Sequence, residues 1–503
     1  MIVASNVIPS SSTVQIAIIA FTILYIGIGA FFARRQGSMQ DFYIAGQRIP
    51  PYVVGFSIAA AVMSGWGYVG GPGAMYASGM STLPIIEVMV LGGYVLSFFL
   101  LARPLRELAS EHGAVTVPDL GEILFDSKLL RVLLAFGVIA GVIGYLAAQY
   151  LAITTIIESI FGIGHIETIF LSATVITVYS TLGAKESAMW TDFIQGVIMV
   201  LATVLAVAWV FTIGGFGEIF TTLSTSPEVG DQDYTAIFRG TPTVTFISYA
   251  LLFGLGIMGL PHMTTKFYTI NKKSMLKWAL PTLLIVYSMM FLFEFMGMAT
   301  RYGVVELGWP ALQNPDQASS LFITQVFPPV IQGVLFAAIV AAILSTADSF
   351  LIVGSSALSR DIYQQYIFPK FLNGNEKYAF DEVWLARVMT FVLGFVPALI
   401  IINPPSIIMW LGALGWGIFA ASLMSVVVLG LHWQNANRYG AIGAATVGLV
   451  VSIGGGILNV GYGVDLILHP GAWGVVLSML TMVLISRATM HRVTNTDIAV
   501  TND

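Results

Sequence analysis

The chain has 503 residues, of which 57% are hydrophobic and only 9% are charged. A soluble protein of this length carries far more charge, so the composition excludes that class and predicts a polytopic protein of the lipid bilayer. The absence of cysteine excludes disulfides, thiolate catalysis and cysteine metal sites. No basic patch supports nucleic-acid binding, and no obligatory protein partner is evident.

Apolar stretches of membrane-spanning length predict an all-α fold with thirteen transmembrane helices. They lie near 13–33, 52–78, 83–102, 130–160, 165–182, 189–212, 243–268, 278–300, 328–358, 383–402, 406–430, 438–458 and 465–486. With the N-terminus outside, this count places all of the 21 lysines and arginines except Arg239 and Arg301 in cytoplasmic segments. That bias is the one expected of a multi-pass protein in the plasma (inner) membrane.

Two of these stretches cannot form continuous helices. The first contains Ser64-Gly-Trp-Gly-Tyr-Val-Gly-Gly-Pro-Gly73, and the second contains Phe253-Gly-Leu-Gly-Ile-Met-Gly-Leu-Pro-His262. Inside a helix, glycine costs about 1 kcal/mol and proline about 3 kcal/mol relative to alanine. Backbone groups freed at mid-membrane depth must line a cavity or contact protein, and in transporters they bind ions and solute.

The broken helices organise the predicted domains. Because they cross the membrane in opposite directions, we expect two inverted repeats of five helices each, 47–213 and 243–430. An extra helix within residues 1–35 precedes the repeats, and an external loop with a short helix, 214–242, separates them. Two more helices, 437–487, and a cytoplasmic tail, 488–503, complete the chain.

Four acidic residues fall within predicted spans: Glu87, Asp192, Glu294 and Asp348. A charge is costly in hydrocarbon, so each is a candidate for ion or proton binding. Structural roles stay open, since Asp192 is expected near the start of its helix, where a carboxylate stabilises the dipole. Glu87 and Glu294 are also explained as interior hydrogen-bond partners.

Ser345, Thr346, Asp348 and Ser349 place several hard oxygen ligands within about one helical turn. The small residues before them, Ala338, Ala341 and Ala342, allow another helix to approach closely. This pattern is typical of a sodium site, but it also fits a packing face whose hydroxyls bond back to their own helix. Lys266 is expected to mark the cytoplasmic end of the second broken helix.

Motifs for other functions are missing. The chain contains no Walker-type phosphate loop, so it is not expected to drive transport with ATP by itself. It contains neither the His-Glu-x-x-His nor the Gly-x-Ser-x-Gly motif of hydrolases, so it is not expected to be an enzyme.

Five motifs together resemble those of the sodium:solute symporter family, and the resemblance covers nearly the whole chain. They are Asp41–Arg48, Ser64-Gly-Trp66 with Gly70–Gly73, Thr191-Asp-Phe-Ile-Gln195, Gly259-Leu-Pro-His262, and Leu344-Ser-Thr-Ala-Asp-Ser349 followed by Ser355–Tyr363. The resemblance implies a leucine-transporter-like five-plus-five inverted repeat and uptake of a solute driven by Na⁺.

The resemblance also implies site residues. A main sodium site is expected from the backbone carbonyls of Ala60, Met63 and Ala342 with the hydroxyls of Ser345 and Thr346. A second sodium site, found in some members, matches Asp192, Ser345, Asp348 and Ser349. The residues expected to bind solute are Trp66, Gly67, Tyr145, Gln149, Phe253, Ile257 and Pro261, with Trp416 nearby; packing is the alternative role for the aromatic ones.

The solute is predicted to be a small organic molecule. The chain resembles the proline branch of the family at Met63–Trp66 and Tyr145, but it departs from that branch at Val62, Phe253 and Ile257. Other motifs resemble the pantothenate and monocarboxylate transporters, so a carboxylate is the first expectation and proline, or another amino acid, the alternative. A proton-coupled transporter, a channel and a transporter-like sensor are further alternatives.

Overall fold

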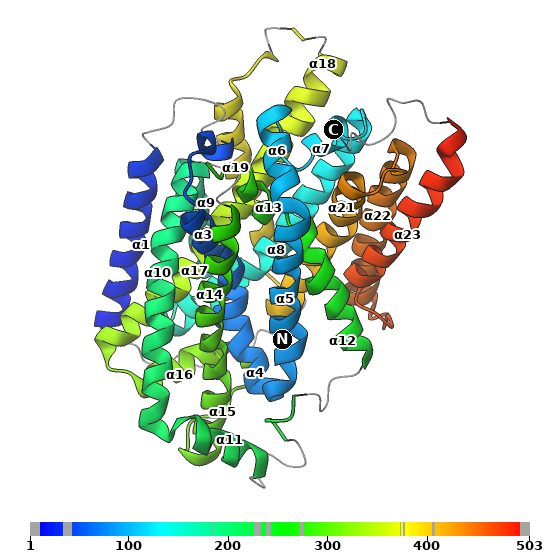
Figure 1. Cartoon of the computed structure of the whole chain (residues 1–503). Helices are drawn as coiled ribbons and strands as arrows, with labels where there is room; N and C mark the ends of the chain where they lie inside the picture. The colour runs from blue at the N-terminus through cyan, green and yellow to red at the C-terminus, as the bar shows by residue number, and fades with distance from the viewer. Residues whose placement is uncertain are drawn as a thin grey trace.

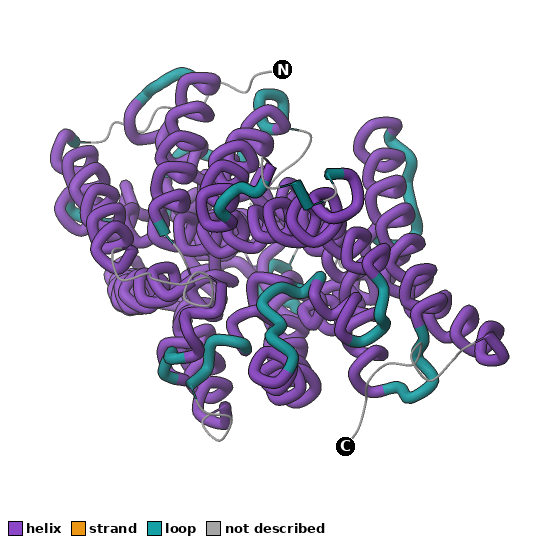
Figure 2. The backbone as a smooth tube through the Cα atoms, turned by 90° about the horizontal axis from the view of Figure 1, so that it is seen from above, coloured by secondary structure: helices purple, strands orange, loops and turns teal. Residues whose placement is uncertain are grey.

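The computed structural model describes residues 11–33, 43–183, 185–225, 233–237, 243–271, 276–372, 374–375, 378–404 and 408–492. Parts of the predicted external loop 214–242, the tail beyond residue 492 and the start of the Asp41–Arg48 motif lie outside this range, as does the side chain of Glu87. Within it the protein is a bundle of helices, and the sole strand-like pairing is an isolated β-bridge (Figures 1 and 2).

The first predicted repeat consists of five helical segments, two of them interrupted. Their bounds are α3 (Pro51–Gly65), η2 (Trp66–Gly70) and α4 (Gly71–Ser78); α5 (Leu83–Ser97), η4 (Phe98–Ala102) and α6 (Arg103–Glu111); α8 (Lys128–Phe161); α9 (His165–Leu182); and α10 (Lys185–Val210). A short helix, α7 (Asp119–Ile123), precedes α8, and α1 (Ser12–Ala33) precedes the repeat.

The second predicted repeat also consists of five helical segments. Its segments are α12 (Thr243–Tyr249), η7 (Ala250–Leu255), η8 (Gly256–Gly259) and α13 (Pro261–Phe267); α14 (Leu276–Phe291), η10 (Leu292–Phe295) and α15 (Met296–Glu306); α17 (Pro329–Ser356) with η12 (Ala357–Ile367) and α18 (Phe368–Phe371); α19 (Glu382–Ile400); and α20 (Ile408–Phe419), η14 (Ala420–Met424) and α21 (Ser425–His432). The chain ends with α22 (Arg438–Tyr462) and α23 (Pro470–Thr489).

Short helices also lie between the spans. The predicted external loop contains α11 (Gly215–Thr225), and the connection from α15 to α17 contains η11 (Pro315–Gln317) and α16 (Ala318–Val326). In Figure 1, α11 and α16 lie at the end of the bundle opposite to α18.

All thirteen predicted ranges contain helix. Within the described residues, ten helices are long and apolar enough to cross a membrane, or eleven when the bent pair formed by Thr243–Gly259 and Pro261–Phe267 is taken as one span. The remaining two ranges hold α5 with η4, and α9. The membrane class and the helical fold are therefore confirmed, whereas thirteen crossings remain a prediction.

The outer helices present apolar side chains on their surface. On α1, at one edge of the bundle in Figure 1, Ile16 is 65% exposed and Ile23 is 64% exposed. A row of exposed isoleucines is unfavourable in water but matches the hydrocarbon of a bilayer. The two most enclosed spans are instead the one that begins with α3 and the one that contains α17, with 94% and 83% of their apolar windows buried.

The two broken helices run in opposite directions. Ile49, just before α3, forms a β-bridge with Ile270, just after α13. The amide of Ile49 donates to the carbonyl of Thr269 over 3.1 Å, and the amide of Asn271 donates to the carbonyl of Ile49 over 3.3 Å. The start of one broken helix thus meets the end of the other, as an inverted repeat requires.

A network of ion pairs joins the two repeats at this same end of the bundle. The Arg131 guanidinium on α8 pairs with Asp119 on α7, and it lies 3.2 Å from Glu122 and 3.8 Å from Asp361 on η12. Asp361 also accepts a hydrogen bond from the Thr116 hydroxyl over 3.0 Å. These contacts attach the loop before α8 to the end of the long central helix.

Candidate functional site

The first helix break lies at Ser64. Its φ of 38° and ψ of −178° depart from helical values, and a positive φ is rare for a residue other than glycine. Such strain persists only when the surroundings hold it in place. The Ser64 hydroxyl accepts a hydrogen bond from the Trp66 amide over 3.0 Å and lies 3.0 Å from the Tyr145 hydroxyl on α8.

Gln149 stabilises the same break from one turn further along α8. Its side-chain oxygen accepts a hydrogen bond from the Gly65 amide over 2.9 Å, and both groups are buried. Its side-chain nitrogen is buried and has no hydrogen-bond partner among the described residues. Gln149 therefore satisfies one freed backbone amide and keeps an unused donor at the break.

Glycines at the break allow neighbouring helices to approach the backbone. A methyl group on Gly65 would lie 2.7 Å from the Ala152 side chain and 2.8 Å from that of Ile343 on α17. A methyl group on Gly71 would lie 2.5 Å from the carboxylate carbon of Glu294, and one on Gly67 2.8 Å from Met63. Glu294 thus packs against the broken segment, and Gly67 faces Met63 and Glu294.

The second break follows from proline chemistry. Leu260 is extended, with φ −73° and ψ 110°, because the residue before a proline is disfavoured in the helical region. Pro261 begins α13, and the helix axis bends by 43° there. Both interruptions predicted from the sequence are therefore present in the structure.

The oxygens predicted for the main sodium site converge between α3 and α17. The Ser345 hydroxyl donates to the carbonyls of Ala60, over 3.2 Å, and Ala342, over 3.0 Å. The Thr346 hydroxyl donates to the carbonyls of Ala61, over 2.8 Å, and Ala342, over 2.9 Å. Two hydroxyls and three carbonyls thus form one buried cluster of oxygens suited to a hard cation.

Two details of this cluster differ from the sequence-based expectation. The Ala61 carbonyl takes part, although only Ala60 was expected. The Met63 carbonyl instead accepts a hydrogen bond from the Trp66 amide within the broken helix.

The residues predicted for a second sodium site lie beside a buried lysine. The Lys266 ammonium on α13 donates to Asp192 Oδ2 over 3.1 Å and to the Ser57 carbonyl over 2.8 Å. The Ser57 hydroxyl donates to the same carboxylate oxygen over 2.6 Å. The Lys266 and Asp192 side chains are 1% and 0% exposed. Lys266 does lie at the end of its helix, but its ammonium points into the protein.

A second lysine completes this cluster of buried charges. Lys185, the first residue of α10, is buried and donates to the Thr265 hydroxyl over 3.0 Å. Asp348 on α17 is buried and interacts electrostatically with Asp192 and with both lysines. Ser349 is buried next to it. One carboxylate oxygen, Oδ1, of each aspartate has no hydrogen-bond partner within the described residues.

Four aromatic side chains from separate helices meet beside the break. The ring of Trp416 on α20 lies 6.5 Å from Trp66 and 6.0 Å from Tyr145, in stacked orientations, and 4.9 Å from Phe253. Trp66 also lies 5.7 Å from Phe253. Together with Gln149 and Ser64, these rings form a packed aromatic cluster with a few polar groups, a composition that is common in small-molecule sites.

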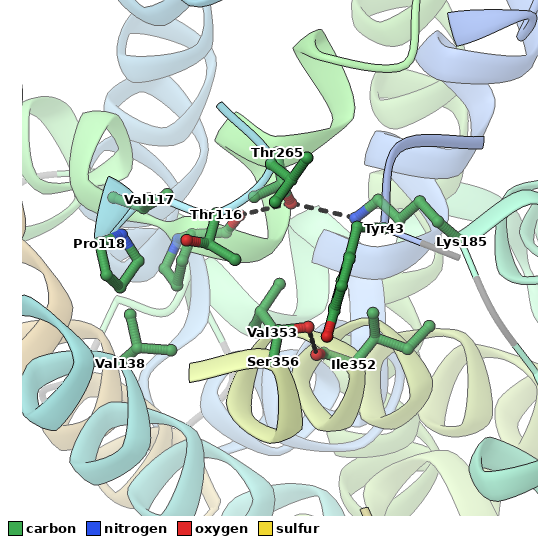
Figure 3. Close-up of a pocket in the computed structure, with 12 residues that line it drawn as sticks. Tyr43, Thr116, Val117, Pro118, Val138, Lys185, Thr265, Ile352, Val353 and Ser356 are labelled. Carbon is green, nitrogen blue, oxygen red and sulfur yellow. Dashed lines mark hydrogen bonds between the residues drawn. The ribbon is translucent and has the colours of Figure 1, made fainter. Parts of the chain in front are cut away.

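Two predicted solute-binding residues lie elsewhere. Ile257 is fully buried and packs against α5, where a methyl group on Gly93 would lie 2.9 Å from its side chain. Pro261 lines a separate pocket between the break and the loop before α7, together with Tyr43, Thr116, Lys185, Thr265 and Ser356. Figure 3 shows the Lys185 ammonium meeting the Thr265 hydroxyl at the wall of this pocket.

Sequence reasoning missed Ala61, Ser57, Thr265 and Lys185 as members of these clusters. One signal was available for Lys185, because it precedes Asp192 by seven residues and two helical turns bring such residues to one face. Lys185 and Lys266 were assigned to cytoplasmic segments by their charge. In the structure both side chains are buried, with Lys266 beside Asp192 and Lys185 beside Thr265.

The fold and sequence match known transporters. A family model described as the sodium:solute symporter family matches residues 42–448. The chain is 30% identical to the osmoregulated proline transporter OpuE of Bacillus subtilis, with 95% of this chain and 94% of the relative covered. It is 29% identical to a sodium/proline symporter of Staphylococcus aureus, with 84% and 81% covered.

Two solved structures share the fold. A Na⁺-coupled sialic acid symporter in a substrate-bound, outward-open state aligns with a TM-score of 0.78 and 21% identity over 98% of this chain and 99% of that one. Mhp1, a transporter of the nucleobase-cation-symport-1 family, aligns with a TM-score of 0.52 and 13% identity over 90% and 96%. From the match of the family model and the identity to its curated relatives, this chain belongs to the sodium:solute symporter family and is a multi-pass membrane transporter, not an enzyme.

Proposed function

We propose that this protein is a sodium-coupled symporter that imports proline or a closely similar small zwitterion. The observation that carries the proposal is the aromatic cluster of Trp66, Tyr145, Phe253 and Trp416 beside a strained helix break with an unused amide donor. The relatives named as proline transporters favour this solute over the carboxylate that was the first expectation from the sequence.

The aromatic cluster and Gln149 offer the kinds of groups that a small imino acid needs. The free side-chain nitrogen of Gln149 can donate to the solute carboxylate, since two N–H donors on one amide suit an anionic acceptor. The aromatic faces can cover the apolar ring, and a positively charged amine over Trp66 or Trp416 gains about 0.5–2 kcal/mol from cation–π attraction.

Sodium would bind at the oxygen cluster of Ala60, Ala61, Ala342, Ser345 and Thr346. This cluster joins α3 of the first repeat to α17 of the second through hydrogen bonds of 2.8–3.2 Å. An ion held there would stabilise one arrangement of the two repeats and the break at Ser64, only a few residues away. Solute affinity and sodium affinity would then rise together, because coupling between two sites is reciprocal.

A carboxylate without an amine is the second candidate. Val62, at the position where the proline branch carries an aspartate, is apolar and only 4% exposed. That substitution removes a negative charge that would attract an amine, and it favours a solute such as pantothenate or a short monocarboxylate. The Gln149 donor serves either solute.

Uptake by purified protein in proteoliposomes tests the proposal. Labelled proline should accumulate only with an inward sodium gradient, and unlabelled proline should compete better than pantothenate, acetate, pyruvate or lactate. Stronger competition by a carboxylate would select the second candidate. Uptake driven by a pH gradient without sodium, or single-channel currents, would replace symport by proton coupling or by a channel.

A further inference from the structure

The buried charges around Asp192 belong to no step of the proposed cycle. The Lys266 ammonium contacts two oxygens that a cation at this position would use, the Asp192 carboxylate at 3.1 Å and the Ser57 carbonyl at 2.8 Å. Both side chains are almost fully enclosed. An ammonium is a compact charge with three donors, so it can hold such oxygens as a metal ion does, although its donor geometry differs.

When all four groups are ionised, the formal charges of this cluster sum to zero. Asp192 and Asp348 contribute two negative charges, and Lys185 and Lys266 contribute two positive charges at one locus where all four interact. A sodium ion bound there as well would leave one uncompensated positive charge at a buried site, which is strongly unfavourable. His262, which interacts electrostatically with both lysines, can add only positive charge.

We propose that Lys266 is a built-in cation that takes the place of a second sodium ion, so that this transporter binds one sodium ion in each cycle. This inference rests on the proposed sodium-coupled transport and deepens it by fixing the stoichiometry. The sequence-based expectation of a second sodium at Asp192, Ser345, Asp348 and Ser349 is thereby replaced by a single ion at Ser345 and Thr346.

The Lys266 ammonium also connects the two predicted repeats. Lys266 lies on α13 of the second repeat, whereas Ser57 and Asp192 lie on α3 and α10 of the first. A sodium ion at this point would leave with each cycle, but a tethered ammonium stays with the chain. The unpaired Oδ1 atoms of the two aspartates mark where a further cation would bind if one lysine were removed.

Equilibrium binding of ²²Na⁺ to the purified protein, without solute, tests the stoichiometry directly. The wild-type protein should bind one sodium ion, with a Hill coefficient of one. Lys266→Met keeps an unbranched side chain but leaves the cluster with an excess negative charge, so it should bind two sodium ions with a Hill coefficient above one. Lys277→Met, which removes an exposed lysine, is the control and should behave as wild type.

A double variant covers the case in which Lys266→Met does not fold. Asp192→Asn with Lys266→Met removes both charges of the pair and leaves Asp348 balanced by Lys185, so this variant should bind one sodium ion. Two bound sodium ions in the wild-type protein would overturn the inference. One bound ion in a folded Lys266→Met protein would also overturn it.

The same measurement separates this inference from the proposed function. Protein that binds no ²²Na⁺, and whose uptake ignores sodium, contradicts sodium-coupled transport itself. Protein that binds two sodium ions and transports proline with sodium supports the proposed function and contradicts only the role of Lys266. One ion in the wild type and two in Lys266→Met supports both.

Discussion

The side-chain oxygen of Gln149 accepts a hydrogen bond of 2.9 Å from the backbone amide of Gly65, at the point where α3 stops being helical. A residue near the middle of α8 thus stabilises the break in another helix of the same repeat. The contact couples the shape of the candidate solute site to the position of α8.

Replacing Gln149 by alanine should weaken both the break and solute binding. The Gly65 amide would be left buried without a partner, which costs about 1–3 kcal/mol and corresponds to roughly five-fold to 150-fold in an equilibrium constant. The dissociation constant for labelled proline and the thermal unfolding midpoint in detergent measure the two effects.

Tyr145→Phe is the matched comparison for that variant. It removes a hydroxyl from the same face of α8, but Ser64 keeps its hydrogen bond with the Trp66 amide. Its loss of affinity should therefore be smaller than that of Gln149→Ala. An equal or larger loss would show that Gln149 does not have the role inferred for it.

A methyl group at Gly65 should disrupt the break. In Gly65→Ala the new carbon would lie 2.7 Å from Ala152 and 2.8 Å from Ile343, well inside contact distance. Overpacking of this kind costs about 1–3 kcal/mol, and here it also separates α3 from α8 and α17. We expect a lower unfolding midpoint and little uptake. Gly454→Ala on α22, where nothing lies within 4 Å, should leave both unchanged; equal behaviour of the two variants would refute the argument.

Removing both hydroxyls of the sodium cluster should raise the sodium requirement. In Ser345→Ala with Thr346→Ala, three backbone carbonyls remain but two ligands are lost, so we expect the half-maximal sodium concentration for uptake to rise at least about tenfold, equivalent to about 1.4 kcal/mol. Thr346→Ser, which keeps its hydroxyl, should need sodium much as the wild type does. An unchanged sodium requirement in the double variant would place the ion elsewhere.

Asp316 should make stability depend on pH. This residue lies in η11, outside the membrane spans, and burial raises its pKa from 3.8 to about 6, while the hydrogen bond from the Ile408 amide acts in the opposite direction. Between these values the folded state binds more protons than the unfolded state. Stability therefore falls as pH rises from about 4 to about 6 and is then constant, with a total change of about 3 kcal/mol.

Asp316→Asn should remove this dependence, because an amide keeps an acceptor for Ile408 but carries no charge. The unfolding midpoint of Asp316→Asn minus that of the wild type should therefore be larger at pH 7 than at pH 4.5. Asp465→Asn, at an exposed position, controls for the loss of one acidic charge. A midpoint difference that is the same at both pH values would contradict the burial argument.

The sequence by itself determined the membrane class, the two helix breaks and the hydroxyl pair at Ser345 and Thr346. Each of these depends on local chemistry: runs of apolar residues need hydrocarbon around them, glycine and proline interrupt a helix wherever it packs, and neighbouring hydroxyls on one helix stay together. The contact of Ser345 with the Ala60 carbonyl could be predicted only because the helix breaks and the family motifs indicated the same pair of helices.

Only the tertiary structure decided which side chains meet between helices. Trp66, Tyr145, Phe253 and Trp416 come from four distant segments, and no local pattern states that their rings converge. The sequence placed Lys185 and Lys266 at helix ends, where a lysine usually reaches water. Their ammonium groups are buried because Thr265, Asp192 and Ser57 offer them oxygens, and those partners lie far away in the chain.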